Sequence, residues 1–287
     1  MELARGNPSI PQENGDEPLT PEAAIETVAA KPLATQQKGE GAIPKCALMF
    51  HGISEPRTRE EAAYSIAPRR FHGLMRWFRT MGYNTLKVAD WLSDSIPAKR
   101  VLLTFDDGCD DLSTELLPIV VEHHYTPIVF LVADLIGGTN LWDQAKGLRA
   151  RQLLTLEQIR EMQRYGMEFG SHSATHPLLT KLSDNQLRSE VADSKHRLED
   201  LLGVEVLSFA YPYGAVDERV RVAVAEAGYQ LAFTAEPGTN LENDPLLQRR
   251  AEVNDATGVT DFLFKLRYGQ GVRVTLGAFR RRLGGQS

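Results

Sequence analysis

Residues 102–108, LLTFDDG, decide the fold of this chain. The apolar residues are typical of a buried strand, which ends abruptly in Asp106, Asp107 and Gly108. Side chains alternate between the two faces of a strand, but a turn at the glycine brings both carboxylates to one rim. One carboxylate can then bind a cation while the other accepts a proton. By itself, an Asp-Asp-Gly sequence is more often an ordinary turn.

A second segment, SHSATHP at residues 171–177, places two histidines four positions apart after another short apolar run. Catalytic zinc sites take three protein ligands from imidazole nitrogens and carboxylate oxygens and keep one position open. Asp107, His172 and His176 form such a set, which leaves Asp106 as the base. A lone histidine pair is often a surface feature, but two motifs that each follow a strand-like segment predict a metal site. Zinc is the expected ion, and cobalt, nickel or manganese suits the same ligands.

Strand-like and helix-like segments alternate through most of the chain. Strands are expected at residues 46–50, 83–88, 100–105, 127–132, 168–171, 207–210 and 230–234, and helices begin near Pro68, Ser113, Thr155, Ser183 and Asp217. A long loop, residues 134–153, interrupts this pattern, and loops of that length are often functional. The alternation predicts a parallel β/α architecture, although periodicity does not decide whether the sheet closes into a barrel.

Length and charge limit the classes of function. The chain has 287 residues, 42% of them hydrophobic, so it can bury a substantial core. Its 32 basic and 38 acidic residues give a net charge of −6, which argues against binding to nucleic acid through general electrostatics. Two cysteines, Cys46 and Cys109, do not make a disulfide framework, and we expect Cys109 to be a small buried thiol.

The ends of the chain differ in composition from its middle. Residues 1–42, rich in Pro, Glu, Gln, Gly and Ala, are expected to form a disordered leader, residues 43–270 the folded domain and residues 271–287 a basic tail. No stretch approaches the roughly 20 apolar residues of a membrane span, and the N-terminus lacks a secretory pattern. We therefore expect no stable membrane insertion and a cytoplasmic monomer by default, or action outside the cytoplasm if the true start lies elsewhere.

The TFDDG and HSxxHP sequences resemble the first two motifs of the polysaccharide deacetylases, the NodB-homology group that forms carbohydrate esterase family 4. The resemblance extends over about residues 43–250. It implies an irregular, incomplete (β/α) barrel with its active face at the carboxyl ends of the strands. It also implies metal-dependent removal of N-acetyl groups from glycans that contain N-acetylglucosamine. The family's roles fall on the residues already chosen: Asp106 is the base, and Asp107, His172 and His176 are the ligands.

A third family motif matches YPYG at residues 211–214. In the family, a tyrosine of this turn presents its backbone N–H to the oxyanion that develops on the substrate. Tyr213 occupies the matching place. Tyr211 and Pro212 are expected beside the substrate.

Two departures indicate a subgroup. Many members carry an arginine where this chain has Ala210, and that arginine orients the catalytic aspartate; Arg249 or Arg250 is the candidate to replace its charge. Typical members also have a histidine near the C-terminus that acts as the general acid, but no histidine follows His196 here. The deacetylases of poly-N-acetylglucosamine resemble a circular permutation that moves this element to the N-terminal side. His51 then becomes the proton donor, since imidazole titrates near neutral pH.

Two tryptophans are candidates for contact with a sugar. Trp142, in the long loop, could stack on a sugar ring or cover the core. Trp91 could form a wall of the substrate groove or belong to an amphipathic turn over the core. Two other functions stay open: a deacetylase of O-acetyl esters, lipid-linked sugars or nucleotide sugars, and a glycan-binding protein that keeps the fold without catalysis.

Overall fold

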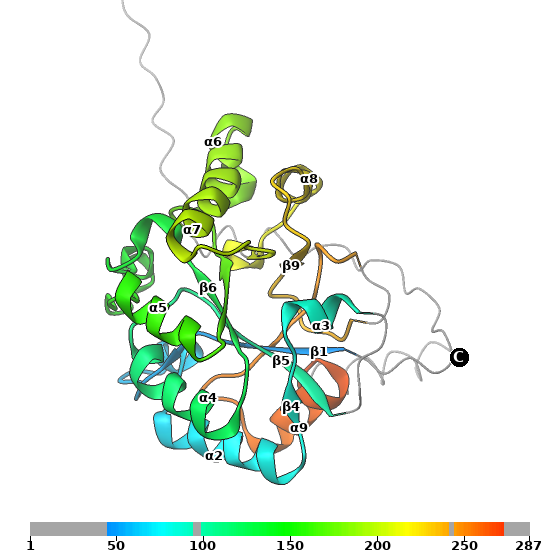
Figure 1. Ribbon diagram of the computed structural model, residues 1–287. Helices are drawn as coiled ribbons and strands as arrows, with labels where there is room; N and C mark the ends of the chain where they lie inside the picture. Colours follow the sequence, from blue (N-terminus) through cyan, green and yellow to red (C-terminus); the bar gives the residue numbers. More distant parts are fainter. Residues whose placement is uncertain (1–44, 94–98, 241–243, 273–287) are drawn as a thin grey trace, which may run out of the picture. The chain divides into compact units, whose positions relative to one another are not determined.

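The structure is a computed structural model that describes residues 45–93, 99–240 and 244–272 (Figure 1). The expected leader and nearly all of the expected basic tail lie outside these residues, so their organisation stays a prediction.

One parallel sheet forms the centre of the fold. Its strands follow the spatial order β10-β1-β5-β6-β7-β8-β9, and β4 pairs with the start of β5. The bounds are β1 Cys46–Phe50, β4 Asn84–Thr85, β5 Arg100–Phe105, β6 Ile128–Leu131, β7 Glu168–Ser171, β8 Ser208–Ala210, β9 Leu231–Phe233 and β10 Ala251–Glu252. A parallel bridge between Phe233 and Gln248 connects β9 to the chain just before β10. The sheet therefore curls into the incomplete (β/α) barrel that the resemblance implies, and this expectation is confirmed.

Helices follow most of the strands, and two short strands, β2 (Gly52–Ile53) and β3 (Ser65–Ile66), form a separate pair. The α-helices are α2 Pro68–Thr80, α3 Val88–Leu92, α4 Leu117–His123, α5 Leu156–Arg164, α6 Asp184–Arg188, α7 Ser194–Leu202, α8 Glu218–Glu226 and α9 Val259–Tyr268. The 3₁₀ turns are η1 Glu61–Ala63, η3 Ala133–Leu135, η4 Leu141–Lys146, η5 Leu179–Lys181 and η7 Pro212–Gly214. Two π turns, η2 Leu112–Leu116 and η6 Ser189–Asp193, widen the starts of α4 and α7.

Local sequence signals set several helix starts. Thr155 and Gln158 form the expected capping box of α5, because the threonine hydroxyl accepts the Gln158 N–H and the glutamine side chain accepts the Thr155 N–H. At the start of α6, the Gln186 side-chain oxygen accepts the Ser183 N–H at 3.1 Å and the Ser183 hydroxyl at 2.7 Å. The expected helix at Ser113 starts differently, with the π turn η2 ahead of α4.

The strand expected at residues 83–88 is mostly absent. Only β4 pairs there, because the Lys87 N–H donates to the Asp90 carboxylate at 3.0 Å and starts α3 instead. The chain therefore turns away from the sheet two residues after β4.

Apolar side chains bury both faces of the sheet. One cluster lies between the sheet and the covering helices and includes Phe71 of α2, Ile119 of α4 and Leu198 of α7. A smaller cluster fills the opposite face around Phe130 and Phe233. Strands buried on both faces carry continuous apolar runs. This explains why sequence alone locates the central strands of this chain.

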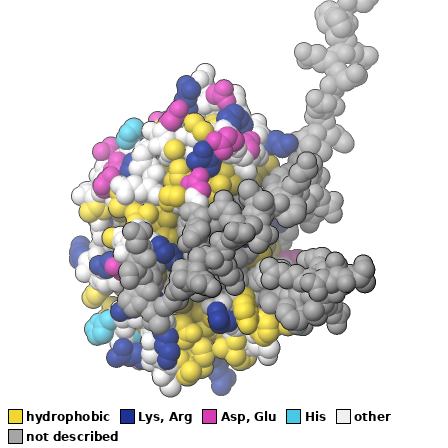
Figure 2. Space-filling model, turned by 90° about the vertical axis from the view of Figure 1, so that its right-hand side faces the viewer, with side chains coloured by type: hydrophobic (Ala, Val, Ile, Leu, Met, Phe, Trp, Pro, Cys, Tyr) yellow, Lys and Arg dark blue, Asp and Glu magenta, His cyan; other side chains and the backbone are white. Residues whose placement is uncertain are grey.

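The surface combines charged groups with scattered apolar side chains. Val259 and Leu263 of α9 are exposed, and Figure 2 shows hydrophobic side chains among Lys and Arg on the lower part of the molecule, where α2 and α9 lie. Cys46 and Cys109 are buried free thiols, as expected for Cys109. Within the described ranges, no helix has the length and apolar character needed to cross a membrane.

Candidate active site

The carboxylate pair follows β5 in a tight turn. Asp107 and Gly108 have φ of 71° and 72°, and the Gly108 N–H donates to the Asp106 carbonyl at 2.9 Å. A Cβ on Gly108 would lie 2.8 Å from a methyl group of Leu131, so at this φ any other residue would be strained and would force that side chain to move. The turn leaves both carboxylates at the carboxyl end of the sheet, as the sequence predicts. Asp107 itself shares the left-handed conformation.

The histidine motif follows β7, the second strand beyond β5. The His172 N–H extends the sheet by donating to the Leu131 carbonyl at 2.8 Å. Ser173 and His176 then take φ of 64° and 66°, and the Ser173 hydroxyl accepts the His176 N–H at 3.0 Å. This fold-back brings the His176 ring to the His172 ring, with centroids 4.8 Å apart.

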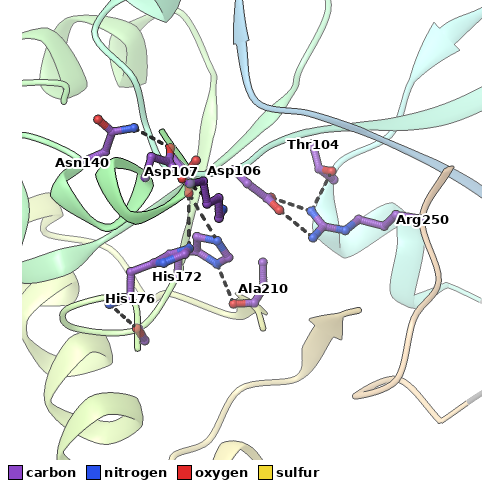
Figure 3. Close-up of polar contacts among 11 residues, drawn as sticks. Thr104, Asp106, Asp107, Asn140, His172, His176, Ala210 and Arg250 are labelled. Carbon is purple, nitrogen blue, oxygen red and sulfur yellow. Dashed lines mark hydrogen bonds and ion pairs between the residues drawn. The ribbon is translucent and has the colours of Figure 1, made fainter. Parts of the chain in front are cut away.

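Three buried donor atoms meet between these segments (Figure 3). The Asp107 Oδ1 lies 3.6 Å from His172 Nε2 and 3.5 Å from His176 Nε2. Three donor atoms of this residue set lie within 4.8 Å of one another. Those two separations are too long for hydrogen bonds. Two ligands each at roughly 2.1 Å from a tetrahedral zinc ion would lie about 3.4 Å apart, so the donor set fits such an ion.

The pKa shifts of the two histidines agree with that fit, whereas Asp107 needs a nearby cation to favour its ionised form. Burial, followed by the charges of Asp143 and Asp106, raises the pKa of Asp107 well above its ordinary value. Burial lowers the pKa of His172, and burial together with the His172 charge lowers the pKa of His176 well below its usual range. Neutral imidazoles carry the lone pairs that metal binding needs.

The two histidines are oriented by different means. His172 Nδ1 lies 2.8 Å from the Ala210 carbonyl, which leaves Nε2 as the donor to a metal. His176 Nδ1 is buried and has no hydrogen-bond partner among the described residues. Its ring instead stacks on Trp142 at 4.4 Å and meets the edge of Tyr213 at 4.7 Å. Packing therefore orients His176 where a hydrogen bond orients His172.

Asp106 is held by Arg250, whose side chain is fully buried. Arg250 donates from Nη1 and Nη2 to the two oxygens of Asp106 at 2.6 and 2.7 Å (Figure 3). It also donates from Nε to the Thr234 carbonyl at 3.0 Å. Burial alone would raise the pKa of Asp106, but the charges of Arg250 and His172 outweigh it and hold that pKa below its ordinary value. Asp106 is therefore an ionised carboxylate with both oxygens engaged.

Of the two candidate arginines, Arg250 occupies the place that the sequence left open. It reaches Asp106 from the segment before β10, although Ala210 stands where many family members have their arginine. Arg249 points elsewhere, with Nε 3.7 Å from Glu236 Oε2 and a side chain 36% exposed. The two arginines are neighbours in the sequence, so the sequence does not show which of them contacts Asp106.

His51 follows β1, the neighbour of β5 in the sheet. Its half-buried ring meets the ring of Tyr64 edge-on at 5.5 Å. Burial lowers the pKa of His51 to about 4, against the opposing charge of Asp106. The imidazole is therefore neutral at pH 7.

Residues that sequence reasoning did not single out lie on η4, inside the long loop. The Lys146 ammonium lies 4.6 Å from the Tyr64 ring centre and 5.2 Å from the Tyr213 ring centre. It donates to Asp143 at 3.0 Å, and Asn140 holds the second oxygen of that carboxylate at 2.8 Å. The loop thus folds against the site. In the sequence, only the length of the loop and the presence of Trp142 indicated that it contributes to the site.

Proteins of known family resemble this chain in sequence and in fold. A sequence profile described as polysaccharide deacetylase matches residues 93–232. The Bacillus subtilis (strain 168) protein YxkH, whose name places it among the polysaccharide deacetylases, is 30% identical over 196 residues, or 67% of this chain and 64% of that protein. The chain belongs to the polysaccharide deacetylase family.

Other relatives in the family extend this comparison. The Staphylococcus epidermidis poly-beta-1,6-N-acetyl-D-glucosamine N-deacetylase is 23% identical over 192 residues, or 62% of this chain and 63% of that protein. The chain therefore spans less than two thirds of either relative. The structure of the Streptococcus pyogenes deacetylase PplD in complex with acetate is similar with a TM-score of 0.66 and 25% identity, covering 77% of this chain and 97% of PplD. IcaB from Ammonifex degensii has the same fold, with a TM-score of 0.63, 23% identity and coverage of 74% and 92%.

The structure corrects the expected position of two residues. Trp91 is 2% exposed, lies in the smaller core cluster and donates from Nε1 to Gln248 at 2.9 Å, so it faces the core and no groove. Tyr211 is also fully buried, and its hydroxyl donates to the Leu246 carbonyl at 2.9 Å. Their polar atoms are already satisfied inside the fold. Pro212 is buried beside Tyr211, whereas Trp142 and Tyr213 are half-buried at the site.

Proposed function

We propose that this protein is a metal-dependent deacetylase that removes N-acetyl groups from glycans containing N-acetylglucosamine. The observation that carries the proposal is the contrast within one turn. The Asp107 carboxylate lies beside the imidazole nitrogens of His172 and His176, while the carboxylate of its neighbour Asp106 is kept ionised by Arg250. Amide hydrolysis needs a polarised carbonyl and a base: Asp107 would help hold the cation that polarises the carbonyl, and Asp106 would be the base.

Asp107, His172 and His176 would hold the metal, with zinc the expected ion. When bound, a divalent cation lowers the pKa of water from about 15.7 toward 7 and polarises the acetyl carbonyl. The ligand types do not separate zinc from cobalt, nickel or manganese.

The remaining steps belong to side chains and backbone. Asp106 accepts the proton of the attacking water, and Arg250 keeps it ionised and oriented for that transfer. The backbone N–H of Tyr213, whose φ of 60° sets the turn after β8, donates to the oxygen that gains charge. His51, neutral at the outset, takes up a proton from solvent during turnover and delivers it to the departing amine nitrogen as the C–N bond breaks, while the water proton held by Asp106 returns to solvent.

The substrate class rests on the relatives and on the half-buried aromatic groups at the site. The S. epidermidis relative is an N-deacetylase of a β-1,6-linked N-acetylglucosamine polymer. Trp142 presents an aromatic surface beside His176, and such surfaces suit the apolar face of a sugar ring. Lys146 adds hydrogen-bond donors for sugar hydroxyls.

Acetate release tests the proposal directly. The protein, stripped of metal by a chelator and then resupplied with zinc, cobalt or nickel, is incubated with β-1,6-linked N-acetylglucosamine oligomers. We expect release only after metal is restored. Release that survives metal removal would refute the reaction class. Release only from O-acetylated sugars would move the substrate to esters.

The role of His51 has its own test, based on the leaving group. An amine must be protonated as it departs, whereas an aryl acetate releases a phenolate that needs no proton. We expect His51→Ala to lower kcat on the N-acetyl substrate about 100-fold or more, with a much smaller loss on an aryl acetate. Equal losses on both substrates would assign His51 to another role.

A further inference from the structure

Glu190 belongs neither to the ligand set nor to the proposed base, yet its carboxylate binds the loop that carries both histidines. Its Oε2 accepts the N–H groups of Ala174 and Thr175 at 3.0 and 2.9 Å, and its Oε1 accepts the Thr175 hydroxyl at 2.5 Å. Its backbone carbonyl accepts the Ala174 N–H as well, at 3.1 Å. We infer that Glu190 is a positioning residue that holds the histidine loop in its metal-binding shape.

The loop needs such support because its backbone is strained. Ser173 and His176 both have left-handed φ without being glycine, a conformation that is unfavourable for such residues and that contacts around the loop must offset. Ala174 and Thr175 lie between them. The two N–H groups that Glu190 binds are therefore those of the only residues separating the two strained positions. Hydrogen bonds to an ionised carboxylate are stronger than neutral ones, which suits this purpose.

The helix side of the contact is also specialised. Glu190 lies in the π turn η6, between α6 and α7, and π turns often occur at functional sites. Val191 and Ser194, which follow Glu190 along the helix, hold the other end of the loop. Ser171, immediately before His172, donates to the Ser194 hydroxyl at 2.9 Å, and Ser194 donates to the Val191 carbonyl at 2.9 Å. One helical segment thus holds the loop on both sides of His172.

The inference rests on the proposed metal site, and its consequence is measured as metal affinity. Groups that orient ligands typically change metal affinity about 10- to 100-fold when they are removed. We therefore expect the dissociation constant of zinc or cobalt to rise by that factor in Glu190→Ala, as measured by competition with a chromophoric chelator. Metal-free thermal unfolding, recorded in parallel, reports the separate cost to stability.

Glu199→Ala is the matched control. Glu199, on α7, also accepts a backbone N–H, that of Val206 at 3.0 Å, and it pairs with Lys195 at 2.5 Å. Both partners lie outside the histidine loop. This variant loses a comparable carboxylate from the same helical run. It should lower stability and leave metal affinity within about twofold of the parent, which is well below the effect of removing a ligand-orienting group.

Glu190→Gln separates hydrogen bonding from charge. The amide oxygen can accept the two backbone N–H groups and the amide nitrogen can donate to the Thr175 hydroxyl, so the loop keeps its contacts while the negative charge is lost. We expect Glu190→Gln to retain most of the affinity that Glu190→Ala loses. Equal losses in the two variants would show a through-space charge effect and overturn the positioning role.

The outcomes distinguish this inference from the proposed function. If the parent protein binds no metal, the proposed function fails; if it binds metal and Glu190→Ala binds equally well, only the role of Glu190 fails. Should Glu190→Ala not fold, hydrogen exchange on the metal-free parent decides instead. Slow exchange of the Ala174 and Thr175 amides supports the positioning role of Glu190, and exchange at the rate of free amides overturns it.

Discussion

The two halves of the site begin one residue apart and are built in opposite ways. In the base half, Asp106 has both oxygens bonded to Arg250, so its charge is balanced within the protein. In the ligand half, Asp107 faces His172 and His176 at 3.5–3.6 Å, and no cationic side chain among the described residues hydrogen-bonds to these three. The pKa of Asp106 is lowered and that of Asp107 is raised.

This difference shows how a protein gives adjacent carboxylates separate chemistry. The Arg250 guanidinium keeps Asp106 ionised and ready to act as a base. In the ligand half, the lone pairs of Asp107, His172 and His176 are buried close together, which costs free energy unless a cation binds between them. The first half should therefore respond to mutation of the protein alone, and the second to the concentration of metal.

The largest expected effect comes from removing the base while the ligands stay. Asp106→Asn should lower kcat about 100- to 10,000-fold, because an amide cannot accept the proton from water. Metal affinity should stay close to that of the parent protein, as measured by chelator competition. Loss of metal binding together with activity would show that the two halves are not separate.

Removing a ligand should give the converse result. A ligand that binds the folded state stabilises it, by about 2.7 kcal/mol when the metal is present at 100 times its dissociation constant. Adding zinc should therefore raise the Tm of the parent protein and of Asp106→Asn. It should leave the Tm of His176→Ala nearly unchanged. A rise of equal size in His176→Ala would place metal binding elsewhere.

The ion pair between Arg250 and Asp106 can also be removed by substituting the arginine. Arg250→Met leaves Asp106 buried and unpaired, which typically costs about 3–5 kcal/mol in the free energy of unfolding. Arg249→Met is the control, because its partly exposed ion pair should contribute less than about 1 kcal/mol. Denaturant unfolding of the two variants measures the difference, and equal values would contradict the role given to Arg250.

The same variant should change the pH dependence. Arg250 lowers the pKa of Asp106, so the stability from this carboxylate is present at neutral pH and is lost as pH falls through the lowered pKa. Without Arg250 the pKa rises, and both the base and its contribution are lost at higher pH. The acidic limb of the kcat profile should therefore move upward, while that of Arg249→Met stays in place.

Sequence alone predicts the site where short-range order determines it. The Asp pair and the histidine pair each follow an apolar strand, and parallel strands deliver their ends to one edge, so both motifs could be placed together. Arg250 was harder to assign because its neighbour Arg249 has the same chemistry. Only the path of the chain before β10 decides between them. Glu190 gave no signal, since its partners are backbone N–H groups that lie 15 and 16 residues away.

Trp91 and Trp142 show the same limit in another form. Trp91 lies in the short helix α3 and Trp142 in the 3₁₀ turn η4 of the long loop. The sequence left the same two positions open for each, beside a sugar or over the core. Trp91 joins the buried face of the sheet because α3 turns it toward Phe233, with ring centres 6.1 Å apart. Trp142 reaches His176 through a loop whose course depends on many contacts distant in sequence.

The smallest expected effect lies within the ligand half, where the two histidines differ in what orients them. His172 is held by the Ala210 carbonyl and His176 by stacking on Trp142. An aromatic pair is worth about 0.5–1.5 kcal/mol beyond its buried area, so Trp142→Leu should weaken metal binding about 2- to 13-fold. Trp142→Phe keeps a stacking ring and should recover most of that loss. If the leucine variant binds metal as tightly as the parent, the strained loop alone orients His176, and the contrast between the two histidines has no energetic consequence.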